Sequence, residues 1–232
     1  MANNVEFFLN NVDPTTQVKF PYYFDGAPRD DTNLKVMFVG NSITIHEPKP
    51  DINWYKKCGM AASDLQHDYV HLVYSYLCGK YQKVSICAFN GGQWEKDFTN
   101  VDKLNALRKC YLEFNPDILI IRIGENFNRD YLKEGIDPYI GFTNLMNAFE
   151  GGKSKKIITS LFWRNNLIDD AIIKIAMEYK LPYIDISDLG TDKKFMAFSQ
   201  YPENEIFLSH PGDLGMQEIA NRIIKVLEND KN

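Results

Sequence analysis

The chain has 232 residues, 44% of them hydrophobic, which is enough to form one sizeable core. Its formal net charge is -5, with no basic stripe, so neither nucleic acid nor an anionic membrane is expected as a partner. No apolar run reaches the roughly 18–20 residues that span a bilayer. The amino terminus lacks a signal-peptide pattern and the cysteines lack a short paired spacing, which together predict a cytoplasmic protein with reduced thiols.

The first strong structural signal is an apolar run at residues 36–39, which leads into a Gly-Asn-Ser turn ending at Ser42. A short apolar run rich in β-branched and aromatic residues is typical of a strand buried on both faces. The preceding residues, 1–33, carry short apolar patches broken by prolines. They are expected to form a lead-in packed on a single domain, 34–232.

The rest of the chain alternates between strand and helix patterns. After a long loop at residues 41–60, a capping-box pattern at 63–66 predicts the start of a helix. Apolar residues at helical spacing predict the other helices, and short apolar runs predict the other strands. The expected strands lie at 84–89, 117–123, 156–161 and 182–186, and the expected helices centre on 65–76, 104–112, 140–149, 168–175 and 219–227.

This alternation predicts an α/β fold. Strands that are apolar throughout form a parallel sheet covered on both faces, which predicts a three-layer α/β/α sandwich with about five parallel strands. Because ligands bind beyond the carboxyl ends of such strands, the residues just past each strand should meet at one edge. Those residues include Ser42, Gly92 and Asn126, and the loop before the last helix can return His210 to the same edge.

These residue types are the ones that acyl transfer requires. Ser42 supplies a nucleophilic hydroxyl, and His210 is the one histidine of four that is placed to act as its general base. The main-chain amides of Ser42 and of the turn at 90–92, together with the Asn126 carboxamide, are candidate donors to an oxyanion.

The order of these motifs resembles the SGNH hydrolase (GDSL-type esterase) superfamily. The four matching blocks are Val39-Gly40-Asn41-Ser42-Ile43-Thr44, Asn90-Gly91-Gly92, Gly124-Glu125-Asn126 and His210-Pro211. The resemblance runs from about residue 35 to the carboxyl terminus. It implies a flavodoxin-like fold, hydrolysis of carboxylic esters, Ser42 as nucleophile, His210 as general base and Asn126 as an oxyanion donor.

The chain departs from the family pattern in its first two blocks. Asn41 stands where many members have an aspartate, which keeps a hydrogen-bonding side chain and removes a charge. In the second block Gly92 is the preferred oxyanion donor, although some members place the donor a few residues later, near Trp94 or Glu95. Because only a main-chain N–H is required there, a residue other than glycine can serve.

The third departure concerns the residue that orients the histidine. Family members usually place an aspartate three residues before it, and here that position is Phe207. A dyad of Ser42 and His210, with a backbone carbonyl orienting the ring, is therefore the leading interpretation. Asp213 is the main candidate for an orienting acid, and Glu125 and Glu205 are weaker ones.

Other polar and aromatic residues fall near the predicted active edge. Asn41, Trp54 and Trp163 are candidates to line a substrate pocket, although packing explains the tryptophans at least as well. Arg122 interrupts an apolar strand and is expected to pair with a carboxylate. Two histidines four residues apart, the first at His67, are spaced like zinc ligands but lack a third partner, so no metal or other cofactor is expected.

The predicted function is that of a serine esterase acting on short-chain esters, acetyl esters foremost, of small molecules or carbohydrates. An O-acyltransferase acting on a glycan would use the same Ser42 acyl-enzyme and differ in how well it excludes water. A binding module that lost the chemistry is a third interpretation, which Phe207 favours and the joint presence of Ser42, Asn126 and His210 opposes. The sequence gives no indication of the oligomeric state.

Overall fold

A six-stranded sheet in the order β1-β3-β2-β4-β5-β6 forms the centre of the fold. The computed structural model describes residues 21–24 and 34–229. The strands are β1 (Tyr22–Phe24), β2 (Leu34–Gly40), β3 (Val84–Asn90), β4 (Ile118–Arg122), β5 (Lys155–Thr159) and β6 (Tyr183–Ile184). All neighbours pair in parallel except β1, which lies antiparallel to β3. The expectation of about five parallel strands is thus confirmed, with one antiparallel edge strand added.

The five parallel strands follow the flavodoxin-like order. The chain places β3 on one side of β2 and then crosses over to place β4 on the other side, so the strand order switches between β2 and β4. Crevices outside the carboxyl ends of the strands at such a switch are where open α/β sheets bind ligands. The Gly-Asn-Ser turn follows β2 and the Gly-Glu-Asn turn follows β4. The predicted blocks therefore lie on the two strands that flank this point.

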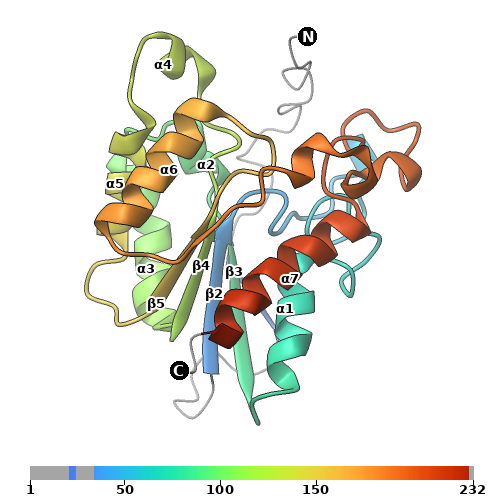
Figure 1. Ribbon diagram of the computed structural model, residues 1–232, viewed down its shortest axis with the longest axis horizontal. Helices are drawn as coiled ribbons and strands as arrows, with labels where there is room; N and C mark the ends of the chain where they lie inside the picture. Colours follow the sequence, from blue (N-terminus) through green and yellow to red (C-terminus); the bar gives the residue numbers. More distant parts are fainter. Residues whose placement is uncertain (1–20, 25–33, 230–232) are drawn as a thin grey trace.

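Helices cover both faces of the sheet (Figure 1). The helices are α1 (Tyr69–Cys78), α2 (Gly92–Glu95), α3 (Asn105–Phe114), α4 (Arg129–Lys133), α5 (Pro138–Ala148), α6 (Asn166–Glu178) and α7 (Asp213–Asn229). Short 3-10 turns connect them: η3 (Pro50–Ile52), η4 (Val101–Leu104), η5 (Leu189–Thr191), η6 (Lys193–Phe195) and η7 (Ala197–Ser199). Figure 1 shows α1 and α7 side by side on one face, and α3, α5 and α6 on the other.

The sheet divides the hydrophobic core into two layers, because successive side chains of a strand point to opposite faces. Along β2, Val36 and Phe38 pack with α1 and α7, whereas Met37 and Val39 pack with α3, α5 and α6. All four side chains are fully buried. This confirms the three-layer sandwich and explains why the strand has no polar face.

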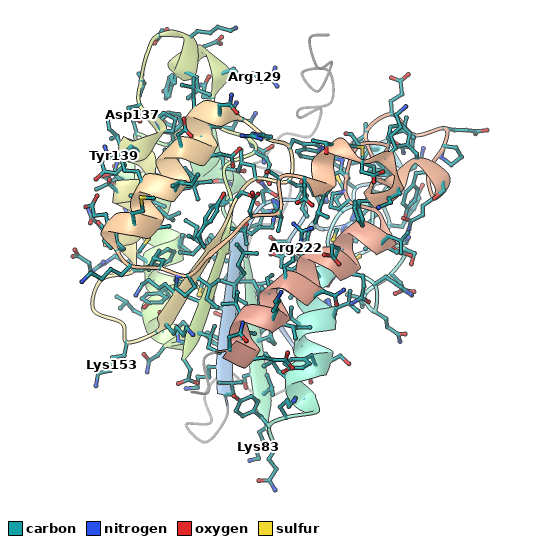
Figure 2. The ribbon with its side chains drawn as sticks, viewed as in Figure 1. Lys83, Arg129, Asp137, Tyr139, Lys153 and Arg222 are labelled. Carbon is teal, nitrogen blue, oxygen red and sulfur yellow. The ribbon has the colours of Figure 1, made fainter. Side chains whose placement is uncertain are left out.

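The polarity of the sheet can be followed in Figure 2. Lys83 and Lys153, which precede β3 and β5, lie at the lower edge of the view. Arg129, which begins α4 after the end of β4, lies at the upper edge. The upper edge is therefore the carboxyl edge, where the candidate residues gather. No helix in the described part of the chain is both long and apolar enough to cross a membrane.

Two local expectations need adjustment. The helix predicted to open at 63–66 begins at Tyr69, because the buried Asp68 side chain caps it by accepting from the amide of His71 at 2.7 Å. Leu65, the first residue of the expected helix at 65–76, is 41% exposed and lies before α1. Of the lead-in 1–33, the paired strand β1 is described next to β3, and the remainder lies outside the described residues.

Candidate active site

The candidate nucleophile lies in a tight turn directly after β2. Gly40 makes this turn possible, because a Cβ there would lie 1.8 Å from Thr44 Oγ1 and 2.7 Å from the Arg122 carbonyl oxygen. The Thr44 amide donates to the Asn41 carbonyl at 2.9 Å, and the Ser42 carbonyl accepts from the Met60 amide at 2.8 Å. These bonds fix Ser42, and with it the start of the long loop, at the carboxyl edge.

The candidate base comes from the far end of the chain. The carbonyl of His210 accepts from the Ala197 amide at 2.9 Å, which fastens the segment before α7 to the turn η7. Trp163, just after β5, packs edge-on against the imidazole with ring centroids 5.0 Å apart. Its indole N–H donates to the Ser209 carbonyl at 2.9 Å. The structure thus places Trp163 against the histidine, where it restricts the ring.

A chain of contacts connects the serine turn to the histidine. Asn41 donates to Glu125 at 2.6 Å, and Glu125 accepts from the Phe162 amide at 3.1 Å. The next residue, Trp163, holds the His210 ring. Ser42 and His210 are each 7% exposed and are not hydrogen-bonded to each other in this structure. Nucleophile–base bonds are often long in unliganded enzymes and shorten when substrate binds.

Burial, together with smaller contributions from the nearby His46 and Arg122, lowers the pKa of His210 from 6.5 to about 3. The main-chain carbonyl of Ile206 raises the pKa of His210, as expected of a backbone carbonyl that orients the imidazole ring. Within the described residues, however, Nδ1 has no partner at full hydrogen-bond geometry. The ring is therefore a neutral imidazole, the form that a general base requires.

The expected site of an orienting acid is part of the core. Phe207 is fully buried, with its ring 5.5 Å from Trp54 and 5.2 Å from Tyr201. Asp213, the alternative acid, instead accepts from the Ser63 amide at 2.8 Å at the start of α7. Among the described residues His210 Nδ1 has no hydrogen-bond partner, so Asp213 does not bond to that atom in this structure.

A second histidine near the base was missed by the sequence analysis. His46 is fully buried, and its Nδ1 lies 2.5 Å from the Glu47 carbonyl. Burial lowers its pKa to about 4. Because His46 influences the pKa of His210, the two rings lie within electrostatic range. Its position four residues after Ser42, at the start of an unusually long loop, was the only available signal.

A buried polar network underlies the serine turn. Arg122 donates to Glu125 at 2.8 Å and to the Asn41 side-chain oxygen at 3.0 Å, which confirms the expected carboxylate partner. Asn41 in turn donates to Glu125 and, at 3.1 Å, to Glu95. Glu95 also accepts from the Asn126 side chain at 2.5 Å. All five residues are at most 5% exposed.

This network contains two carboxyl groups and one guanidinium, and its net effect on Glu95 is a raised pKa. Burial and the neighbouring Glu125 raise the pKa of Glu95, whereas the N–H donors of Asn41 and Asn126 lower it. Asn41, a candidate pocket residue, is 1% exposed and belongs to this network. The substitution of an asparagine for the usual aspartate thus lets residue 41 both donate to the carboxylates and accept from Arg122.

The oxyanion candidates are only partly arranged as expected. The Gly92 amide donates to the Asn90 side-chain oxygen at 2.9 Å, so in this structure it is engaged elsewhere. The Asn126 carboxamide lies at the carboxyl edge, where Glu95 holds it. Trp54, a candidate pocket residue, is 1% exposed, packs against Phe207 and lies in the core. Within the described residues, no group of three or more acidic, histidine or cysteine side chains is placed to hold a metal ion.

No protein-family model and no curated protein matches the sequence, but solved structures share the fold. A psychrotrophic esterase, EstA, from Pseudoalteromonas sp. superposes with a TM-score of 0.55 at 12% identity, covering 85% of this chain and 98% of its own. A two-domain esterase active on acetylated mannans gives a TM-score of 0.57 at 16% identity. That match covers 85% of this chain and 50% of the esterase, so the chain spans one half of it.

A G-D-S-L family protein from Desulfitobacterium hafniense DCB-2, described as lipolytic, is also similar. It superposes with a TM-score of 0.51 at 14% identity, covering 84% of this chain and 99% of its own. The chain therefore has the fold of the GDSL (SGNH) hydrolases, as the four sequence blocks predicted. At these identities the superposition shows the fold, and the chemistry is argued from the residues.

Proposed function

We propose that this chain is a serine esterase of the SGNH hydrolase superfamily, with Ser42 as the nucleophile and His210 as the general base. The observation that carries the proposal is the convergence of three elements at the carboxyl edge. The buried polar network joins the serine turn after β2 to Asn126 after β4, and the Phe162 amide and the Trp163 ring connect this network to His210. Nucleophile, base and oxyanion donor are the components that acyl transfer requires.

In the proposed reaction, His210 removes the proton from Ser42 as its oxygen attacks the ester carbonyl. The Ser42 main-chain N–H and the Asn126 carboxamide donate to the oxyanion of the tetrahedral intermediate. His210 then returns the proton to the departing alcohol, which leaves an acyl-enzyme. Water, activated by the same histidine, attacks the acyl carbon and releases the acid and Ser42.

The proposed substrates are short acyl esters, acetyl esters of carbohydrates foremost. Ser42 and His210 are each only 7% exposed, and Trp163 packs on the histidine at 6% exposure, which favours a small acyl group. The structurally similar two-domain esterase is active on acetylated mannans, which motivates the carbohydrate part of the proposal. Transfer of the acyl group to a glycan hydroxyl would use the same steps with a different acceptor in place of water.

The test is hydrolysis of p-nitrophenyl acetate together with covalent labelling by a fluorophosphonate. We expect Ser42→Ala to lose both, whereas the matched variant Ser63→Ala, in the loop before α1, keeps both. Peptide mapping should find the phosphonate on Ser42. Full activity of folded Ser42→Ala would refute the nucleophile assignment. A folded wild-type protein that binds acetylated sugars but neither hydrolyses esters nor takes up the label would favour the binding module.

A panel of esters tests the substrate class. We expect rates to fall from acetyl to octanoyl p-nitrophenyl esters and to remain measurable on acetylated mannan oligosaccharides. Equal or higher rates on the octanoyl ester would refute the short-chain assignment. Mass spectrometry of reactions that contain an unacetylated glycan would separate hydrolysis from transfer, because only transfer adds an acetyl group to the acceptor.

A further inference from the structure

The Glu95 carboxylate joins the two halves of the candidate site. It lies in α2, is fully buried, and is contributed by neither the serine turn nor the Asn126 turn. Its Oε1 accepts from Asn41 Nδ2 at 3.1 Å and from the amides of Gly124 and Asn126 at 2.7 and 3.2 Å. Its Oε2 accepts from Asn126 Nδ2 at 2.5 Å. One side chain thus reaches both the neighbour of the nucleophile and the oxyanion donor.

We propose that Glu95 is a positioning residue for the oxyanion hole, and that it acts on the reaction through the Asn126 carboxamide. This inference rests on the proposed esterase function. Glu95 holds Asn126 at both its main-chain and its side-chain nitrogen, so the backbone and the carboxamide of Asn126 are fixed together. Since Nδ2 carries two hydrogens, a bond from one to Glu95 sets the direction of the other. Donors fixed before the reaction stabilise a developing oxyanion without reorganisation.

The choice of a carboxylate at position 95 supports this role. Burying a charged carboxylate is costly, and the guanidinium of Arg122 is bonded to Glu125 and Asn41. The two oxygens of Glu95 therefore accept from N–H donors and not from a cation. A neutral glutamine would offer one oxygen and one NH₂ group, so it could accept from the main-chain amides but would oppose the Asn126 NH₂ with donors of its own. At this position only a carboxylate can accept from the main-chain amides with one oxygen and from the Asn126 side chain with the other.

A negative charge on Glu95 and the orientation that Glu95 gives to Asn126 would have opposite effects on the rate. The direction of the measured change therefore shows which effect is larger. A negative charge near the oxyanion disfavours it by Coulomb repulsion, so removing that charge would by itself speed the reaction. Loss of the fixed Asn126 orientation would slow it. A slower Glu95→Gln enzyme would mean that positioning outweighs repulsion.

The experiment is a double-mutant cycle on ester hydrolysis with Glu95→Gln and Asn126→Ala. Loss of one oxyanion donor lowers kcat by roughly 10²–10³, and we expect Asn126→Ala to fall in that range. We expect Glu95→Gln to lower kcat by about 10–100-fold with KM little changed, because the interaction acts in the transition state. If Glu95 acts through Asn126, the double variant should be within about threefold of Asn126→Ala.

Asp169 provides the matched control. It is also a buried carboxylate at the carboxyl edge, and it accepts from the amides of Leu161 and Asn165 at 3.0 and 2.9 Å. Its hydrogen bonds go to these two amides and not to Asn126, so Asp169→Asn should lower stability, and its effect on kcat should multiply with that of Asn126→Ala. All rates are measured at a temperature at which circular dichroism shows each variant folded. If Glu95→Gln does not fold, Glu95→Asp replaces it, since its shorter side chain withdraws from Asn126.

The outcomes separate this inference from the proposed function. If wild type and Ser42→Ala are equally inactive, the esterase proposal fails, and the positioning role fails with it. If wild type is active through Ser42 but Glu95→Gln keeps its full kcat, only the positioning role is refuted. The positioning role is also refuted if the effects of Glu95→Gln and Asn126→Ala on kcat multiply, as we expect the effects of Asp169→Asn and Asn126→Ala to do. The positioning role would be established if Glu95→Gln lowers kcat in the wild-type enzyme but not in the Asn126→Ala variant.

Discussion

Lowering the pH should affect the protonation of His210, the proposed general base, far less than it affects that of an ordinary histidine. Burial lowers the pKa of His210 from 6.5 to about 3. At pH 5.5 a histidine with an ordinary pKa is neutral in only about one molecule in ten, whereas His210 should be almost entirely neutral. The rate at which a fluorophosphonate labels Ser42, or kcat/KM for a short ester, should therefore change less than about twofold between pH 7.5 and pH 5.5.

The same shift predicts how stability depends on pH. Since the folded-state pKa is lower than the unfolded-state one, the unfolded chain takes up the proton first as the pH falls. The stability that neutral His210 contributes is therefore complete above about pH 6.5 and is lost between pH 6.5 and pH 3. The full shift corresponds to about 5 kcal/mol, of which about 2 kcal/mol should be lost by pH 5. His46, with a pKa of about 4, acts in the same direction.

Urea unfolding of wild type and His210→Gln at pH 7 and pH 5 isolates this contribution, because the other titrating groups are common to both proteins. Among them Asp169 has a pKa raised by burial to about 6, so it opposes the trend by favouring the native state as the pH falls. The stability difference between the two proteins should change by about 2 kcal/mol. An acid limb of activity with a midpoint near pH 6.5, together with a pH-independent stability difference, would refute the assignment of His210 as a buried neutral base.

Other substitutions test individual contacts of the site. Phe207→Ala should lower the free energy of unfolding by about 3–5 kcal/mol in urea titrations, because it leaves a cavity in the core. Gly40→Ala should abolish ester hydrolysis and lower the melting temperature, since the added methyl group collides with Thr44 and displaces the serine turn. Trp163→Phe keeps a ring against His210 but removes the indole hydrogen bond, and kcat for acetyl esters should fall by about 3–10-fold with little loss of stability. A kcat equal to that of wild type would show that Trp163 does not restrain the histidine.

The sheet and its order could be predicted because strands buried on both faces leave a clear pattern. The run Val36–Val39 has no polar face, since each side of β2 enters a different core layer. The start of α1 was harder to predict, because two residues with capping side chains, Ser63 and Asp68, precede it. The capping box favoured Ser63, but the fully buried Asp68 side chain, which also accepts from the Gly59 amide, ends up as the cap.

The candidate site was predictable where it depends on a motif and obscure where it depends on distant contacts. Ser42, Asn126 and His210 stand out because they follow strands or precede a helix at recognisable positions. Glu95 gives no such signal, since its role arises only when α2 brings it beneath the turns after β2 and β4. The sequence also could not decide that Asp213 would bond to Ser63 and not to the histidine, because that depends on how α7 docks.

The docking of α7 has a consequence for when activity can arise during synthesis. His210 directly precedes this helix, and α7 packs on α1, which follows the serine loop. The strands that fix Ser42 all precede α7 in the chain, so a growing polypeptide can pair β2, β3 and β4 before α7 has been made. In the proposed mechanism, the base joins the nucleophile only when α7 has been synthesised and has covered the sheet. A chain synthesised only as far as β4 would therefore hold the proposed nucleophile without its base, and docking of α7 would be the step that completes the proposed dyad.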